Sequence, residues 1–232
     1  MDNNQFLDRV LQSFKVFLET GSRSNEKLKP LHGSIAEDLS DRLGNGYEIK
    51  SLGFLEGKEG NIEGRYIDKK VDITVYKDEQ PIAGIGVKFV QQNYAQNSNN
   101  YFENMLGETA NIRSNNIPYF QIFIIPEVLP YYKRNGIIKH WERFDSHYIS
   151  KYEILSNDNI CEFIHTPIKT LLYVLKLPEP TEIRNKVDYV QRYQDLSRIE
   201  VRDTDFGNFG NSVIINDYEV FIDKVIHRIL SI

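Results

Sequence analysis

The segment from residue 71 to 113 constrains the fold of this chain more than any other. Apolar residues at positions 71, 73 and 75 alternate with polar ones, which is the period-two pattern of a half-buried strand. Residues 77–81 read KDEQP and are typical of a turn. A second alternation runs from Ala83 to Phe89. The pattern therefore predicts an antiparallel hairpin.

The predicted hairpin brings two charged side chains to one face. If Tyr76 lies opposite Ile82, then Asp72 lies opposite Gly86, with Lys88 as its diagonal neighbour. Opposite side chains in such a pair are about 5 Å apart and diagonal ones roughly 7–8 Å. Glycines in a strand often mark the close approach of something large. The alternative is an ordinary solvated face that carries one Asp and one Lys.

A loop, a helix and a buried strand follow the hairpin. Residues 91–100 read QQNYAQNSNN and form a polar loop, after which residues 99–113 have helical character. Residues 119–125, YFQIFII, are apolar throughout, as in a central strand buried on both faces. A strand–helix–strand order predicts a parallel pair. We therefore expect an α/β fold with a mixed central sheet flanked by helices.

The rest of the chain is predicted to be mainly helical. Helices are expected at residues 3–20, 30–43, 167–177, 181–196 and 218–230, strands at 47–55 and 149–155, and a turn between Pro126 and Pro130. A length of 232 residues suits one domain. Its core is expected at about 34–126, followed by a C-terminal helical layer or subdomain at about 127–232.

Composition excludes several classes of protein. The single cysteine, Cys161, rules out an internal disulfide and makes a zinc cluster improbable, and it fits a reducing cytoplasm. There is no apolar run of membrane-spanning length and no secretory signal, so we expect a cytoplasmic protein with no membrane partner. The five histidines form no HExxH motif, and the GxSxG, Walker and strand-following GxGxxG motifs are absent. The net charge of −5 does not by itself favour a nucleic-acid binder.

The hairpin, helix and strand together resemble the core of the PD-(D/E)xK nuclease superfamily, and within it the type II restriction endonucleases. The resemblance covers roughly residues 34–126. Asp72 matches the Asp of the motif, and Gly86-Val87-Lys88 matches the acid-x-Lys tripeptide. Val71 replaces the proline that often precedes the Asp, and Gly86 replaces the second acid.

The resemblance implies a Mg²⁺ cofactor, for which Mn²⁺ can substitute. Some restriction enzymes carry the missing acid on the next helix, where this chain has Glu103 and Glu108. Asp72 and Glu103 are the preferred metal ligands because Glu103 lies nearer the strand end, with Glu108 as the alternative. Glu37 matches an additional acid that the superfamily often places on the preceding helix. Each Glu is equally explained as a solvent-facing helical acid.

The implied partner is double-stranded DNA, bound by a homodimer if the target is palindromic. Amide side chains pair with base edges or phosphates, and Lys and Arg neutralise phosphates. The alternative for the amides is a flexible polar loop. The candidate DNA-binding residues are Gln91, Gln92, Asn93, Tyr94, Gln96, Asn97, Asn99, Asn100, Arg113, Lys133 and Arg134.

The expected function is therefore Mg²⁺-dependent hydrolysis of phosphodiester bonds in sequence-specific DNA by a type II restriction endonuclease-like enzyme. Asp72 and a helix acid would bind the metal, and Lys88 would position or activate the attacking water. Because Gly86 removes one motif acid, the alternative is a catalytically inactive nuclease fold that binds DNA or protein.

Overall fold

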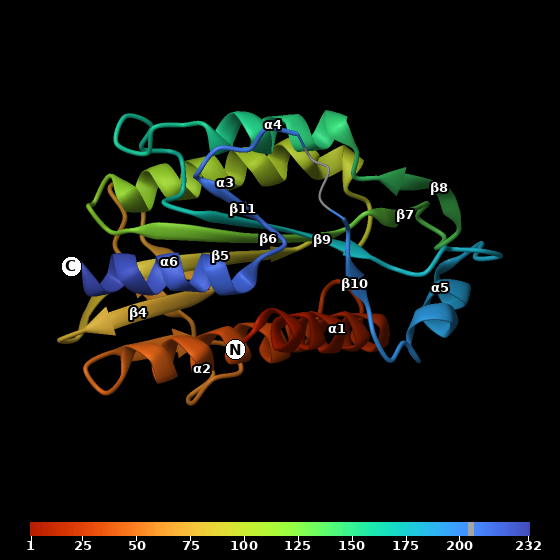
Figure 1. Ribbon diagram of the computed structural model, residues 1–232. Coiled ribbons are helices and arrows are strands. Elements are labelled where there is room, and N and C mark those ends of the chain that lie inside the picture. The colour runs from red at the N-terminus through yellow and green to blue at the C-terminus, as the bar shows by residue number, and fades with distance from the viewer. Residues whose placement is uncertain (204–206) are drawn as a thin grey trace.

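The computed structural model describes residues 1–203 and 207–232, and its centre is a seven-stranded mixed sheet (Figure 1). The strands are β1 (Glu48–Ser51), β4 (Ile73–Lys77), β5 (Gln80–Phe89), β6 (Tyr119–Pro126), β9 (Thr170–Lys176), β10 (Glu200–Val201) and β11 (Val213–Ile215). Their order is β1-β4-β5-β6-β9-β10, and β11 also pairs with β9. β1, β4 and β5 are antiparallel neighbours, whereas β5, β6 and β9 run parallel. The predicted α/β class with a mixed sheet is confirmed.

Helices cover both faces of the sheet. α1 (Asn3–Thr20), α2 (Lys29–Leu43) and α6 (Tyr218–Leu230) pack on one face, and α3 (Ser98–Arg113) and α4 (Ser146–Ser156) on the other (Figure 1). In β6, Ile122 and Ile124 join the first core, while Phe123 and Ile125 join the second. β6 is therefore buried on both faces, as its continuous apolar sequence predicts.

Local sequence signals set the ends of the first two helices. The Asp2 carboxylate accepts a hydrogen bond from the Gln5 backbone N–H, and the Gln5 side chain accepts one from the Asp2 N–H, which is a capping box for α1. Gly21 and Gly44 follow α1 and α2 with φ angles of 80° and 77°, values that favour glycine. A short 3₁₀ turn, η1 (Glu26–Leu28), lies between the two helices.

Smaller elements complete the fold. The strands β2 (Gly60–Ile62) and β3 (Lys69–Val71) form one two-stranded sheet, and β7 (Val128–Tyr132) and β8 (Ile138–Arg143) form another. A 3₁₀ turn, η2 (Ala95–Asn97), leads into α3, and α5 (Lys186–Tyr193) packs near the β7–β8 hairpin (Figure 1). None of the helices in the described ranges is long and apolar enough to cross a membrane.

Four predictions for the second half of the chain were wrong. Residues 149–155 are helical, because Ile149, Tyr152 and Leu155 bury one face at helical spacing. Residues 167–177 contain β9, an interior strand whose side chains enter both cores. The predicted turn between Pro126 and Pro130 contains the start of β7, and the helix at 181–196 shrinks to α5. The segment from 127 onward thus adds strands to the central sheet.

Candidate functional site

Asp72 lies at the start of the β4–β5 hairpin and is hydrogen-bonded to β5. The pairing of Ile73 with Ile85 and of Val75 with Ala83 follows the predicted register. A bulge after Val75 then pairs Tyr76 with Pro81, so the predicted contact of Tyr76 with Ile82 is wrong. Asp72 immediately precedes β4, and its Oδ2 accepts a hydrogen bond of 2.7 Å from the Val87 N–H. The carboxylate is thereby fixed beside Gly86.

A cavity of about 180 Å³ lies between this end of the hairpin and α3. Asp72 and Lys88 both line it, together with Glu108 from α3. The sheet contributes Gly86 and Gln121, and the helix contributes Tyr101 and Asn104. Side chains from β5, β6, α3 and the residue before β4 therefore meet in one small space.

The Asp72 carboxyl has a pKa raised to about 7. Burial is the main cause, and the charges of Glu59 and Glu108 raise the pKa further. The hydrogen bond from the Val87 N–H and the charge of Lys88 lower it, but by less. A carboxyl group with this pKa gains and loses a proton near neutral pH. A cation placed beside it would stabilise its ionised form.

Lys88 lies at the exposed end of β5, but its ammonium group faces the site. Its Nζ lies 4.4 Å from the centroid of the Tyr101 ring, within the range of a cation–π contact. Burial of the ammonium lowers the Lys88 pKa, and the Asp72 charge opposes that shift. The aromatic contact and the carboxylate both hold the positive charge at the cavity.

The glycines of β5 make room for Tyr119. A Cβ atom on Gly86 would lie 2.2 Å from the Tyr119 Oη and 2.8 Å from the Gln121 Oε1. A Cβ on Gly84, which pairs with Tyr119 across the parallel strands, would lie 3.2 Å from the Tyr119 ring. The Tyr119 hydroxyl therefore stands where a side chain at position 86 would begin.

Tyr119 in turn binds Glu108. The Tyr119 hydroxyl donates a hydrogen bond of 2.6 Å to the Glu108 Oε1, and the Lys69 Nζ lies 3.0 Å from the Glu108 Oε2. Burial and the Glu108 carboxylate raise the pKa of Tyr119 well above its usual value, so Tyr119 remains a neutral donor. Both carboxylate oxygens of Glu108 are thus held at the edge of the Asp72 cavity.

The other acids predicted for the site lie elsewhere. Glu103 is exposed and lines a neighbouring cavity with Ile67 and Lys69, so the geometry favours Glu108 over Glu103 as the companion of Asp72. Glu37 is exposed on α2 and lines neither of the two cavities that contain Asp72.

The polar loop after β5 lines a second, wider cavity of about 540 Å³. This cavity also contains Asp72 and Lys88, so it continues from the first one. The loop residues that line it are Gln91, Gln92, Asn93, Gln96 and Asn97. Two of these side chains are tied to β7, since the Asn93 Oδ1 accepts a hydrogen bond from the Tyr132 N–H and the Gln96 Oε1 accepts one from the Tyr131 hydroxyl.

Three other loop residues predicted to bind DNA have different surroundings. Tyr94 is buried and its ring packs against Tyr101, Phe144 and Tyr148, so it is part of the core. Asn99 and Asn100 are exposed in the first turn of α3, outside the wider cavity, and the helix N-cap is Asn97.

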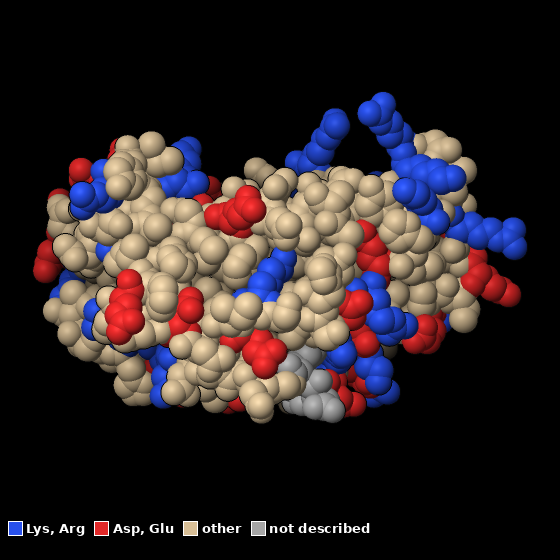
Figure 2. All heavy atoms as spheres, turned by 90° about the horizontal axis from the view of Figure 1, so that it is seen from above, with Lys and Arg blue, Asp and Glu red and all other residues tan. Residues whose placement is uncertain are grey.

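The predicted basic contacts lie away from the cavity. The Arg113 guanidinium donates hydrogen bonds to the carbonyls of Ile160, Phe163 and Thr166, and so organises the loop after α4. Lys133 and Arg134 are exposed at the turn of the β7–β8 hairpin. Figure 2 shows long Lys and Arg side chains reaching outward at this end of the molecule.

The donor set at the cavity fits a hard cation. No group of three or more His, Cys, Asp or Glu side chains in the described ranges is arranged to hold a metal ion. Mg²⁺, however, commonly uses one or two protein carboxylates and takes its remaining ligands from water and substrate oxygens. Asp72 and Glu108 supply two carboxylates to one cavity.

Sequence reasoning missed three residues that contribute to the site through a hydrogen bond, an ion pair or a nearby charge. Glu59, Lys69 and Tyr119 come from segments that carry no motif. The sequence signal for Tyr119 is the pair of glycines in β5, which the pattern alone attributes to the close approach of something large. Comparison of the chain with protein-family models, curated proteins and solved structures gave no significant match.

Proposed function

We propose that this protein is a Mg²⁺-dependent DNA endonuclease that hydrolyses phosphodiester bonds in sequence-specific double-stranded DNA, in the manner of type II restriction enzymes. The observation that carries the proposal is the meeting of Asp72, Lys88 and Glu108 in one cavity. The wider cavity lined by amide side chains continues from it and offers hydrogen-bonding groups to DNA.

The three residues divide two roles between them in this proposal. Asp72 and Glu108 would bind Mg²⁺, for which Mn²⁺ can substitute. The ion would stabilise the negative charge that develops on the phosphoryl oxygens. Lys88 carries its positive charge beside Asp72 and would orient the attacking water and attract the phosphate. Tyr119 and Lys69 would hold the Glu108 carboxylate in position.

Cleavage of mixed-sequence phage DNA tests the proposal. With Mg²⁺, the wild type should give discrete bands, and Asp72→Ala and Lys88→Ala should each lower the rate by about a hundredfold or more. Lys77→Ala is a matched control, because Lys77 is exposed near the turn of the same hairpin. The absence of cutting by the wild type on several DNAs with either metal would reject the enzyme.

A matched pair of variants on α3 identifies the helix acid. Glu108→Gln removes the carboxylate that lines the Asp72 cavity, and Glu103→Gln removes an exposed one on the same helix. We expect cleavage to be lost in Glu108→Gln and retained in Glu103→Gln. The reverse result in the same cleavage assay would return the metal-binding role to Glu103.

A second candidate is a nuclease fold that binds DNA or protein without cutting it. The Tyr119 hydroxyl occupies the space of a strand acid at Gly86, and Glu108 already has Tyr119 and Lys69 as partners. Both features are those expected of a site that has lost its metal. Titration with Mg²⁺ and Mn²⁺ separates the candidates, since a binding module would show no metal-dependent change in stability.

A homodimer belongs to the proposal if the target is palindromic, because a two-fold DNA sequence is matched by a two-fold protein. Sedimentation with and without a palindromic duplex that the enzyme cuts would measure this. Two protein chains per duplex are expected, and one chain per duplex would contradict it.

A further inference from the structure

The wider cavity brings together three hydrogen-bond donors from separate parts of the chain. Lys27 comes from η1, Lys88 from the end of β5, and Gln91 from the loop that follows β5. All three line the cavity that also contains Asp72. Lys27 has no part in the sequence motif or in the roles assigned above.

Lys27 is held in place by its own turn. Its Nζ donates hydrogen bonds of 2.7 Å to the Ser22 carbonyl and 2.6 Å to the Ser24 carbonyl. An ammonium group has three N–H donors, so one remains for another acceptor. Burial, the larger cause, and the charge of Lys88 both lower the Lys27 pKa, as expected for two cations that line one cavity. An anion between them would relieve their mutual repulsion.

Gln91 adds an unpaired donor to the same cavity. Its side chain is buried, with 5% exposure, and its Nε2 has no hydrogen-bond partner among the described residues. Leaving a buried donor unpaired costs about 1–3 kcal/mol. Because the residue borders a cavity with two cations and its buried donor lacks an acceptor, a turn of the Gln91 side chain toward the cavity would give the Nε2 an acceptor on a bound ligand.

We propose that Lys27, Lys88 and Gln91 form an oxyanion site that holds one backbone phosphate of the DNA next to Asp72. The proposal rests on the nuclease function and adds to it a phosphate-binding residue, Lys27, from outside the hairpin. A phosphodiester brings one negative charge and several acceptor oxygens, which match two ammonium groups and an amide N–H. Asp72 repels an anion, so the phosphate lies against the three donors.

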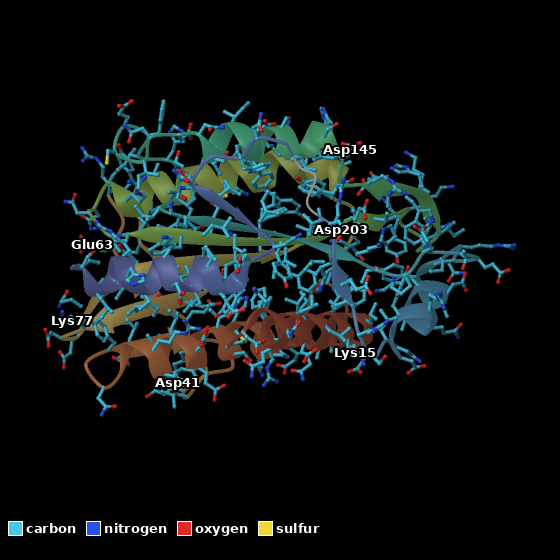
Figure 3. The ribbon with its side chains drawn as sticks, in the orientation of Figure 1. Lys15, Asp41, Glu63, Lys77, Asp145 and Asp203 are labelled. Carbon is cyan, nitrogen blue, oxygen red and sulfur yellow. The ribbon has the colours of Figure 1, made fainter. Side chains whose placement is uncertain are left out.

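DNA binding in EDTA, where no cleavage occurs, tests the role of Lys27. Anisotropy of a labelled duplex that the wild type cuts should show Lys27→Gln binding about three- to tenfold more weakly at 100 mM salt. The slope of log K against log salt should fall by about one, as for one lost phosphate contact. Lys77→Gln is the charge-matched control and should change neither quantity. Figure 3 shows Lys77 at the left edge of the molecule, where β4 turns into β5.

A second variant separates binding from folding. Gln91→Met keeps an unbranched side chain of similar length and removes the unpaired donor. It should leave stability unchanged or raise it, while weakening DNA binding to a similar extent as Lys27→Gln. Unchanged DNA affinity in both variants, with the wild type binding and cutting, would overturn the oxyanion site and leave the nuclease intact.

Binding of inorganic pyrophosphate tests the oxyanion site without DNA. In a thermal shift assay in EDTA, pyrophosphate should stabilise the wild type. It should stabilise Lys27→Gln and Gln91→Met less. If pyrophosphate binds in this way but DNA is neither bound nor cut, the oxyanion site stands as one for a free phosphate compound and the nuclease function fails. If neither pyrophosphate nor DNA binds, both proposals fail.

Discussion

In the proposed site, Asp72 is the residue at which metal binding and proton binding would compete. Its pKa is raised to about 7, mainly by burial, and a bound cation must displace the proton. The affinity for Mn²⁺ should therefore fall by about tenfold for each pH unit below 7 and level off above it. Electron paramagnetic resonance of Mn²⁺ added to the protein at pH 5.5, 6.5 and 8 measures this. No DNA is needed.

The Asp72→Asn variant serves as the control for that titration. It should bind Mn²⁺ weakly at every pH, because the amide supplies no charge. Equal affinity of the wild type at pH 5.5 and 8, or binding that survives in Asp72→Asn, would show that the ion binds elsewhere. This titration thus separates the two candidate functions. The nuclease should bind Mn²⁺ through Asp72, and the binding module should not.

Sequence alone could locate some of these residues but not others. Asp72 and Lys88 were found because strand alternation fixes which face a side chain occupies. The choice between Glu103 and Glu108 depends on how α3 packs on the sheet, which helical periodicity does not determine. Lys27 reaches the site only through the path of the chain after α1.

The register of β5 against β6 explains why Gly86 carries no side chain. A Cβ at position 86 would overlap the Tyr119 hydroxyl, so Gly86→Ala should destabilise the fold by about 1–3 kcal/mol. Tyr119→Phe removes the overlapping oxygen, although it also breaks the hydrogen bond to Glu108. In the Tyr119→Phe background, Gly86→Ala should therefore cost less than in the wild type.

Urea unfolding of the wild type, both single variants and the double variant measures this coupling. The expected interaction energy is favourable and about 1 kcal/mol, in the range for side chains in direct contact. Additive effects within about 0.3 kcal/mol would mean that another contact keeps position 86 as glycine. Ile137→Ala, at an exposed residue before β8, provides a control in which no coupling to Tyr119 is expected.

Elements with a clear period were predicted correctly, and so was the apolar strand β6, but the apolar element β9 was not. α1, α6 and the β4–β5 hairpin have patterns that admit one interpretation. Five consecutive residues of β9 are apolar, and such a short run suits a buried helix as well as a buried strand. Its position between β6 and β10 makes the run a strand, and that position is a property of the whole sheet.

At the scale of the molecule, charge is distributed in a way that the net value of −5 conceals. Basic side chains gather at the β7–β8 end (Figure 2), and Lys27 and Lys88 share one cavity. Phosphate binding depends on such local groupings, since exposed charges farther apart than about 10 Å are largely screened at 0.1 M salt. A negative chain can therefore still present a site for DNA.

His32 and Asp72 affect the pH dependence of the stability of the whole fold with opposite sign. His32 in α2 is fully buried, and neither ring nitrogen has a partner among the described residues. Burial lowers its pKa to about 4, whereas the unfolded chain has the usual value of 6.5. Between these values the unfolded state binds the extra proton, so His32 makes stability rise with pH.

Asp72 acts with the opposite sign in the same range. Its pKa is about 7 in the folded protein and 3.8 in the reference state, so the native state binds the extra proton between these values. Asp72 therefore makes stability fall as pH rises. Each group has a limiting slope of about 1.4 kcal/mol per pH unit, and the two slopes offset each other between about pH 4 and 6.5.

Replacing one group at a time should expose the slope of the other. The stability of Asp72→Asn relative to the wild type should increase with pH from 4.5 to 6.5, because the destabilising ionisation of Asp72 is gone. The stability of His32→Leu relative to the wild type should decrease over the same range, because the variant no longer loses stability in acid. Urea unfolding at pH 4.5, 5.5 and 6.5, in buffers of equal ionic strength, measures both differences. Parallel curves for the three proteins would mean that water or relaxation relieves the burial of both groups. Opposite slopes would show that the Asp72 carboxyl and the unpaired His32 imidazole offset each other in the pH dependence of the folded protein's stability.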